Sequence, residues 1–207
     1  MSSDNASSGH LVLILEPDNP CNTVITDRDT GKVYYRVWTE HSNEKQESVT
    51  KVTDAEGKPV AQWVWRDVRS DILTFEGGKS MSASAWLSKS RVPFKDSVTF
   101  KDLQGRGFKW KGNAPGLSLQ LWPKNDKEHP VVTYKKHYSY KDHKFNPPKQ
   151  VDDPATLTVS AMGQEILDMA IVSFCLLEKD NRIRGNSSTT MAASLAIPHT
   201  IHQIKVD

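Results

Sequence analysis

The sequence has little that points to one particular chemistry. It contains two cysteines, Cys21 and Cys175, which are too few for a disulfide framework, so we expect a reducing compartment. Lysine and arginine number 27 against 25 aspartate and glutamate residues, a balance that argues against a dedicated DNA-binding protein. The first ten residues, MSSDNASSGH, have neither the basic nor the apolar segment of a secretory signal. We therefore predict a globular protein of the cytoplasm.

The common catalytic and metal-binding patterns are also absent from the sequence. It has no Gly-x-Ser-x-Gly nucleophile elbow and no phosphate-binding loop. Its histidines have no zinc-ligand spacing, and no cysteine supports them. We predict no catalytic residue, no metal and no cofactor. Cys21 is the cysteine that looks more exposed, whereas Cys175 lies in an apolar run and is expected to be inert.

The longest apolar run, residues 166–177, is too short to cross a membrane, because a span needs about 20 apolar residues. Only Asp168 and Ser173 are polar within it, and its composition predicts a helix inside residues 161–185. A helix that is apolar on nearly every side is a buried one. The rest of the chain must therefore surround it, and residues 178–180 are expected to mark its solvent-exposed end.

Asp168 is unusual in this helix, because a lone buried carboxylate is costly. We expect its side chain to face one open end of the surrounding structure or to pair with an inward-pointing arginine such as Arg66.

Short strands separated by turns are predicted between residues 10 and 160. In residues 107–111, GFKWK, the alternation places Phe108 and Trp110 on one face and Lys109 and Lys111 on the other. Such alternation is typical of an antiparallel sheet with one apolar face and one solvated face. The predicted strands are residues 11–15, 22–26, 33–39, 47–53, 59–66, 72–75, 81–87, 97–101, 107–111, 116–122, 130–138 and 155–159.

These two features together predict the fold. A curved antiparallel sheet with an apolar concave face buries both itself and the helix if it closes around that helix, and closure also removes exposed strand edges. We predict a mainly β protein, a closed antiparallel barrel of about 12 strands around a hydrophobic C-terminal central helix. Residues 1–9 are expected to form a disordered tail, residues 10–184 one domain, and residues 185–207 a C-terminal extension.

Three segments carry a resemblance to known proteins: residues 19–39 (NPCNTVITDRDTGKVYYRVWT), residues 61–66 (AQWVWR) and residues 163–179 (GQEILDMAIVSFCLLEK). The pattern is similar to the tubby-like fold of tubby C-terminal domains, phospholipid scramblases and plant LURP-one-related proteins. More closely, the chain resembles a fungal (basidiomycete) domain family without an assigned activity. The resemblance implies the barrel. It also favours lipid recognition, since tubby domains bind phosphoinositides, but no tubby head-group residue matches a position here.

The most distinctive polar stretch is residues 134–149, YKKHYSYKDHKFNPPK, in which lysines alternate with aromatic residues. Cations among flat rings suit phosphate groups, either of lipid head groups or of single-stranded nucleic acid. The alternative is a solvated strand and loop whose lysines prevent edge pairing. The candidate ligand-binding residues are Lys135, Lys136, Tyr138, Lys141 and Lys144, with Lys109 and Lys111.

The predicted function is that of a non-enzymatic binding module that recognises an anionic phospholipid or a protein partner. It is expected to act in the cytoplasm or peripherally at a membrane, without a transmembrane span and without binding DNA. Two alternatives stay open. The first is an enzyme with an unrecognised site, at Cys21 or the histidines, because folds such as barrels host many chemistries. The second is a structural protein whose residues 185–207 dock a partner.

Overall fold

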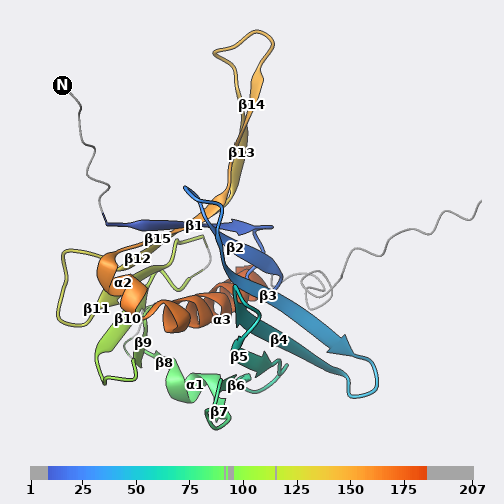
Figure 1. Ribbon diagram of the computed structural model, residues 1–207, viewed down its shortest axis with the longest axis vertical. Coiled ribbons are helices and arrows are strands. Elements are labelled where there is room, and N and C mark those ends of the chain that lie inside the picture. The colour runs from blue at the N-terminus through green and yellow to red at the C-terminus, as the bar shows by residue number, and fades with distance from the viewer. Residues whose placement is uncertain (1–8, 91, 93–95, 115, 186–207) are drawn as a thin grey trace, which may run out of the picture.

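The computed structural model describes residues 9–90, 92, 96–114 and 116–185, and this part of the chain is mainly β (Figure 1). The predicted tail 1–9, except Gly9, and the predicted extension 185–207, except Gly185, lie outside the described residues. The helices are α1 (Ala83–Trp86), α2 (Ala161–Glu165) and α3 (Leu167–Gly185). The strands are β1 (Leu11–Glu16), β2 (Thr23–Asp27), β3 (Val33–Ser42), β4 (Glu47–Asp54), β5 (Pro59–Val64), β6 (Ile72–Phe75), β7 (Met81–Ser82), β8 (Ser88–Lys89), β9 (Val98–Lys101), β10 (Gly107–Lys111), β11 (Gln120–Pro123), β12 (Val132–Lys135), β13 (Tyr138–Asp142), β14 (Lys149–Asp153) and β15 (Ala155–Val159).

Thirteen of these strands form one antiparallel sheet, in the order β7-β6-β5-β4-β3-β2-β1-β15-β12-β11-β10-β9-β8. It consists of two meanders, β1 to β7 and β8 to β12, and β15 joins them. Leu13 of β1 lies opposite Leu157 of β15, and on the other side of β15 Leu157 lies opposite Tyr134 of β12. The beginning and the end of the strand region are therefore neighbours at the centre of the sheet.

The prediction of a closed barrel is wrong, because the sheet is open between its edge strands β7 and β8. Residues 81–87, predicted as a single strand, form the two-residue strand β7 and then the helical turn α1. The run Ala-Ser-Ala here lacks the β-branched and aromatic residues that favour strands. Packing bridges the gap instead of hydrogen bonds, since the ring of Trp86 lies 4.9 Å from that of Phe75 in β6 and 5.2 Å from that of Phe100 in β9.

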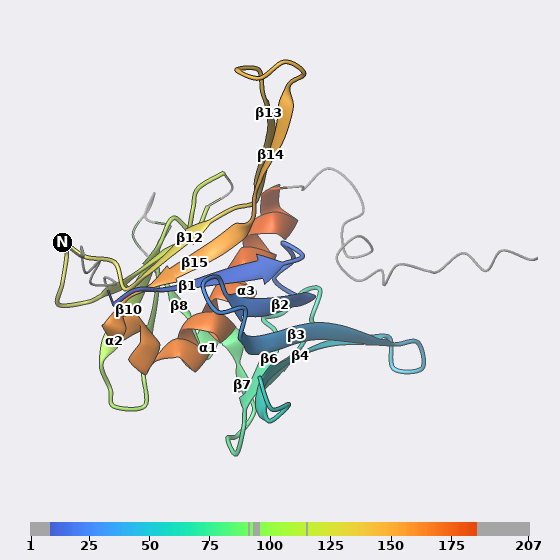
Figure 2. The same cartoon turned by 45° about the horizontal axis from the view of Figure 1, so that its top comes forward.

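The sheet curves around α3, which lies across its inner face in both views (Figures 1 and 2). Every residue from Ala170 to Lys179 is buried, so the prediction that the chain's own strands surround this helix is confirmed. The polar Ser173 is accommodated by hydrogen bonds, as its hydroxyl accepts from Trp110 Nε1 at 2.9 Å and donates to the Met169 carbonyl at 2.7 Å. A buried hydroxyl without such partners would be costly.

The short helix α2 fits against the strands because it contains a glycine at the contact. A Cβ atom added to Gly163 would lie 2.4 Å from the Val131 carbonyl oxygen and 2.8 Å from Val159 Cγ1. The hydroxyl of Ser160 caps this helix by accepting a hydrogen bond from the Gly163 amide at 3.3 Å. The glycine is therefore required by close approach, since its backbone conformation is ordinary.

Replacing Ile171 with aspartate is expected to abolish soluble expression. Ile171 is 1% exposed in the middle of α3, and an unpaired charge there would cost about 4 kcal/mol or more. The control is Ile183→Asp, on the same helix at a position that is 38% exposed. Soluble yield and thermal melting of the two variants provide the measurement, and equal melting temperatures would contradict the buried position of the helix.

Gly163→Ala is expected to lower the free energy of unfolding by up to about 2 kcal/mol. Overpacking usually costs about 1–3 kcal/mol, and roughly 1 kcal/mol of this is offset because alanine favours the helix over glycine. Gly9→Ala is the control, because an added Cβ at Gly9 meets nothing within 4 Å. Urea denaturation measures both variants, and a stabilised Gly163→Ala protein would rule out the close contact with Val131.

Candidate functional site

The segment with the most exposed aromatic residues is a β-hairpin that stands away from the sheet. Its strands, β13 and β14, pair only with each other within the described chain and form a separate two-stranded sheet. Both ribbon views show the hairpin projecting beyond the rest of the protein (Figures 1 and 2). It covers most of the polar stretch 134–149, which the sequence had marked as distinctive, and continues to Asp153.

One face of the hairpin is aromatic. Tyr138 and Tyr140 alternate with Ser139 and therefore point to the same side, where their rings stack with centroids 5.6 Å apart. Tyr138 is 61% exposed and Tyr140 41%, and Phe145 in the connecting loop is 55% exposed. The Lys149 ammonium group lies 6.0 Å from the centre of the Phe145 ring. Three large rings thus face solvent on a thin element.

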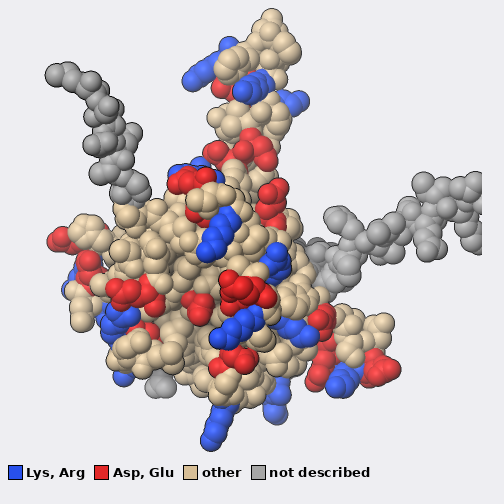
Figure 3. All heavy atoms as spheres, viewed as in Figure 1, with Lys and Arg blue, Asp and Glu red and all other residues tan. Residues whose placement is uncertain are grey.

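The charge of the hairpin changes from base to tip. At the base, Lys135 Nζ lies 2.9 Å from Asp153 Oδ2, and His137 Nε2 lies 2.7 Å from Asp152 Oδ1. Toward the tip, Lys141 and Lys144 have no ion pair among the described residues. In the space-filling view, acidic atoms are concentrated near the base of the projection, whereas basic atoms predominate near its end beside a few acidic ones (Figure 3).

Not all the predicted binding residues come together. Lys141, Lys144 and Tyr138 lie on the hairpin, whereas Lys135 and Lys136 lie at its base. Lys135 pairs with Asp153, and Lys136 Nζ lies 3.5 Å from the buried carboxylate of Glu178.

Two further candidates, Lys109 and Lys111, lie on β10, which both views place away from the hairpin. Lys111 Nζ stands 3.5 Å above the ring of Trp122 on the neighbouring strand β11. Tyr134, the first of the aromatic residues among the lysines of this stretch, is only 1% exposed and belongs to the core.

The C-terminal end of α3 is closed by buried charges, contrary to the prediction that residues 178–180 mark a solvent-exposed end. Glu178 and Lys179 are buried. Arg182 donates to Glu178 Oε1 at 3.0 Å and to Asp18 Oδ1 at 2.5 Å, and Lys179 pairs with the buried Asp71. Helical spacing relates Glu178 to Arg182, but it does not reveal the pairing with Asp18 and Asp71, because these two residues come from distant loops.

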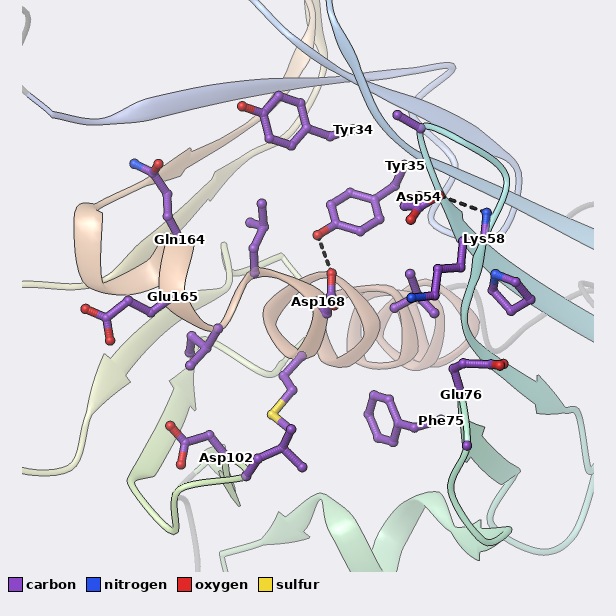
Figure 4. A pocket seen from close by; sticks show the side chains of 18 of the residues that line it. Tyr34, Tyr35, Asp54, Lys58, Phe75, Glu76, Asp102, Gln164, Glu165 and Asp168 are labelled. Atoms are coloured by element: carbon purple, nitrogen blue, oxygen red, sulfur yellow. Dashed lines mark hydrogen bonds between the residues drawn. The ribbon is translucent and has the colours of Figure 1, made fainter.

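The other end of α3 opens on a pocket, and Asp168 faces it. Its carboxylate is exposed and accepts a hydrogen bond from the hydroxyl of Tyr35 at 2.6 Å (Figure 4). The expectation that Asp168 lies at an open end is confirmed, whereas pairing with Arg66 is wrong. Arg66 lines a smaller pocket together with Lys179 and Asp180 toward the opposite end of the helix.

Both cysteines are buried, so the expectation that Cys21 is exposed is wrong. Burial raises the pKa of the Cys21 thiol to about 12. Burial also raises the pKa of Cys175 well above its ordinary value. Thiols react as thiolates, and these two are protonated at physiological pH.

Neither cysteine is expected to react with an aromatic disulfide reagent at pH 8 while the protein is folded, because the raised pKa keeps each thiol neutral and burial blocks access. Both should react once the protein is unfolded in urea, and the released chromophore counts them. Rapid labelling of Cys21 in the folded protein would instead favour the alternative of a cysteine-dependent enzyme.

None of the described helices has the length and hydropathy that a membrane span requires. No group of three or more histidine, cysteine, aspartate or glutamate side chains in the described part of the chain is arranged to hold a metal ion.

Comparison with known proteins places the chain in a family. No curated protein and no solved structure matches it. A family model with the description "Family of unknown function (DUF6593)" matches residues 18–183, which include the hairpin, the pocket and almost all of α3. Because this match covers well over half of the sequence, the chain belongs to DUF6593, a family of unknown function.

Proposed function

We propose that this protein is a non-enzymatic binding module of the cytoplasm that docks on anionic phospholipid surfaces through the β13–β14 hairpin. The observation that carries the proposal is the outer end of the hairpin, where the exposed ring of Phe145 lies among lysines that form no ion pair within the described chain. The exposed rings of Tyr140 and Tyr138 continue from there along β13 toward the base. The protein would bind peripherally, with the tip at the level of the lipid head groups and the sheet outside the membrane.

The exposed rings support an interfacial site. Tyrosine has an apolar ring and a polar hydroxyl, and this combination suits the boundary between head groups and acyl chains. The Tyr138 and Tyr140 rings stack on each other and remain exposed, and Phe145 lies in the loop. Transfer of these rings to the interface would remove apolar surface from water at about 25 cal/mol per Å².

The charge distribution of the hairpin supports binding to an anionic surface, with the loop toward the membrane and the acidic base away from it. Lys141, Lys144 and Lys149 surround the loop and outnumber its one carboxylate, Asp142, which accepts from the backbone amide of Lys144. Each lysine near such a membrane contributes about 1 kcal/mol. Asp152 and Asp153 lie three and four residues from Lys149 along β14, a separation of about 10–14 Å. That separation is as large as the screening length of about 10 Å at 0.1 M salt, so the acidic base opposes binding only weakly.

The resemblance to tubby-like proteins also supports an anionic phospholipid as the ligand, since tubby domains bind phosphoinositides. Kinship with that group and a fungal origin are part of the proposal, but the closed barrel that the resemblance implied is not. The resemblance assigns no head-group residue here, so the proposed site depends on the hairpin's own side chains.

The experiment is sedimentation with liposomes of phosphatidylcholine alone and of phosphatidylcholine mixed with phosphatidylserine or a phosphoinositide. The protein is expected to sediment with the anionic vesicles only, and less as the salt concentration rises. The triple variant Lys141→Ala, Lys144→Ala, Lys149→Ala should lose about 3 kcal/mol of binding free energy, or about a hundredfold in partition coefficient. Lys135 and Lys136 are left unchanged because they form ion pairs at the base.

The matched control is Lys45→Ala, Lys79→Ala, Lys127→Ala, which removes the same charge from exposed positions outside the hairpin. This control should bind almost as the unmodified protein does. Equal losses in the two triple variants would mean that net charge, not the hairpin, causes binding. Absence of sedimentation with any anionic vesicle would reject the lipid proposal and leave a protein partner as the ligand of the hairpin.

A further inference from the structure

A pocket with a volume of about 910 Å³ lies where α3 begins, and the proposed lipid site does not include it. Its walls come from five segments that are far apart in the sequence: residues 32–35, 54–60, 75–81, 102–104 and 164–169. Its volume lies within the range of roughly 300–1,000 Å³ that is usual for small-molecule sites. It is the open end of the space that the curved sheet and α3 enclose (Figure 4).

The pocket combines an apolar wall with many carboxylates. The apolar and aromatic side chains include Tyr34, Tyr35, Phe75, Ile166, Leu167 and Met169. The carboxylates are Asp54, Glu56, Glu76, Asp102, Glu165 and Asp168. Only Lys32 and Lys58 among the lining residues are cationic, so the pocket repels anions in spite of lying at the beginning of a helix.

Three of these carboxylates already have partners. Asp54 accepts from the amides of Glu56 and Lys58 in its own turn, at 3.0 and 2.8 Å. Asp102 and Glu165 share Arg106, whose nitrogen atoms lie 2.6 Å from each carboxylate. The carboxylates of Glu56, Glu76 and Asp168 have no cationic partner among the described residues.

Asp168 is the carboxylate that is held in a defined position. Tyr35, which is 5% exposed, donates to its Oδ1 atom at 2.6 Å. Burial and the hydrogen bond to Asp168 raise the pKa of Tyr35, so the phenol stays protonated and remains a donor. The first turn of α3 also favours a negative charge at this position. The Oδ2 atom has no hydrogen-bond partner among the described residues.

We propose that this pocket binds a small organic ammonium ion with an apolar body. The ammonium group would bind at Asp168 Oδ2, and the apolar body would lie against Tyr35, Phe75 and Met169. Aromatic faces together with carboxylates are the usual recognition elements for organic cations. A bare metal ion fits the pocket less well, because no group of three or more metal-ligating side chains is found in the described chain.

The test uses three probes with the same phenylbutyl body: 4-phenylbutylamine, 4-phenyl-1-butanol and 4-phenylbutyrate. Amide chemical shifts of the isotope-labelled full chain are followed by NMR as each probe is added to millimolar concentration. We expect the amine to bind most tightly, the alcohol less tightly and the carboxylate least. The shifts should concentrate in residues 164–169 and 75–78, which lie on opposite sides of the pocket.

Asp168→Asn removes the charge but keeps an oxygen that accepts from Tyr35, so the variant should fold and weaken amine binding about fivefold. Its affinity for the alcohol should not change. Glu76→Gln removes a second pocket carboxylate without changing α3, and it should also weaken amine binding. Glu44→Gln, in the exposed β3–β4 turn, is the control and should bind the amine normally.

Three results would overturn the proposal. The first is that the carboxylate probe binds as tightly as the amine, and the second is that the chemical-shift changes lie outside the pocket. The third is that Asp168→Asn and Glu76→Gln both leave the affinity for the amine unchanged. Failure of every probe to bind at millimolar concentration would also reject it. Liposome binding is not involved in this measurement, so its outcome is independent of the proposed lipid function.

Discussion

The structure depends on the burial of one helix on all its sides. A helix with an apolar stripe needs a single covering layer, but α3 is apolar around its circumference and must be surrounded. An antiparallel sheet of many strands meets this requirement by curving, since twist and curvature are inherent in such sheets. The position of β15 follows from the same requirement, because it lies next to β1 and precedes the two helices that complete the core.

The two ends of α3 differ: buried charges close the C-terminal end, whereas the N-terminal end opens on a pocket. One proposed site lies near each end. At the C-terminal end, Arg182 bonds to Asp18, which also accepts from the backbone amide of His137 at the base of the hairpin. Buried ion pairs contribute little net stability, but loss of one partner is costly because it leaves the other charge buried and unpaired. At the other end, Asp168 and the surrounding turns leave space open. The closed end therefore contacts the base of the projecting hairpin, and the open end is available to a small ligand.

Local sequence patterns predicted the strands well where one face is buried. Residues 72–75, 107–111 and 155–159 were placed to the residue, as β6, β10 and β15. Strands β13 (YSYKD) and β14 (KQVDD) were missed because neither has a buried face, so neither shows the alternation of aliphatic and polar residues that marks the other strands. Closure of the barrel was predicted wrongly because it depends on pairing between β7 and β8, and no local pattern reports on that pairing.

Local sequence patterns were also insufficient for the candidate sites, which depend on contacts between distant segments. Adjacency in the sequence grouped Tyr134 and Lys136 with Lys141, but the fold buries the first and pairs the second with Glu178. The pocket could not be assembled from the sequence at all, because its walls come from segments up to 137 residues apart that meet only around the beginning of α3. One signal was present nonetheless. A carboxylate in an otherwise apolar helix has to reach solvent or a partner, and Asp168 does both by lying at the end of the core beside Tyr35. A polar exception in a buried helix thus marks where the surrounding sheet ends, and that boundary is where a ligand can enter.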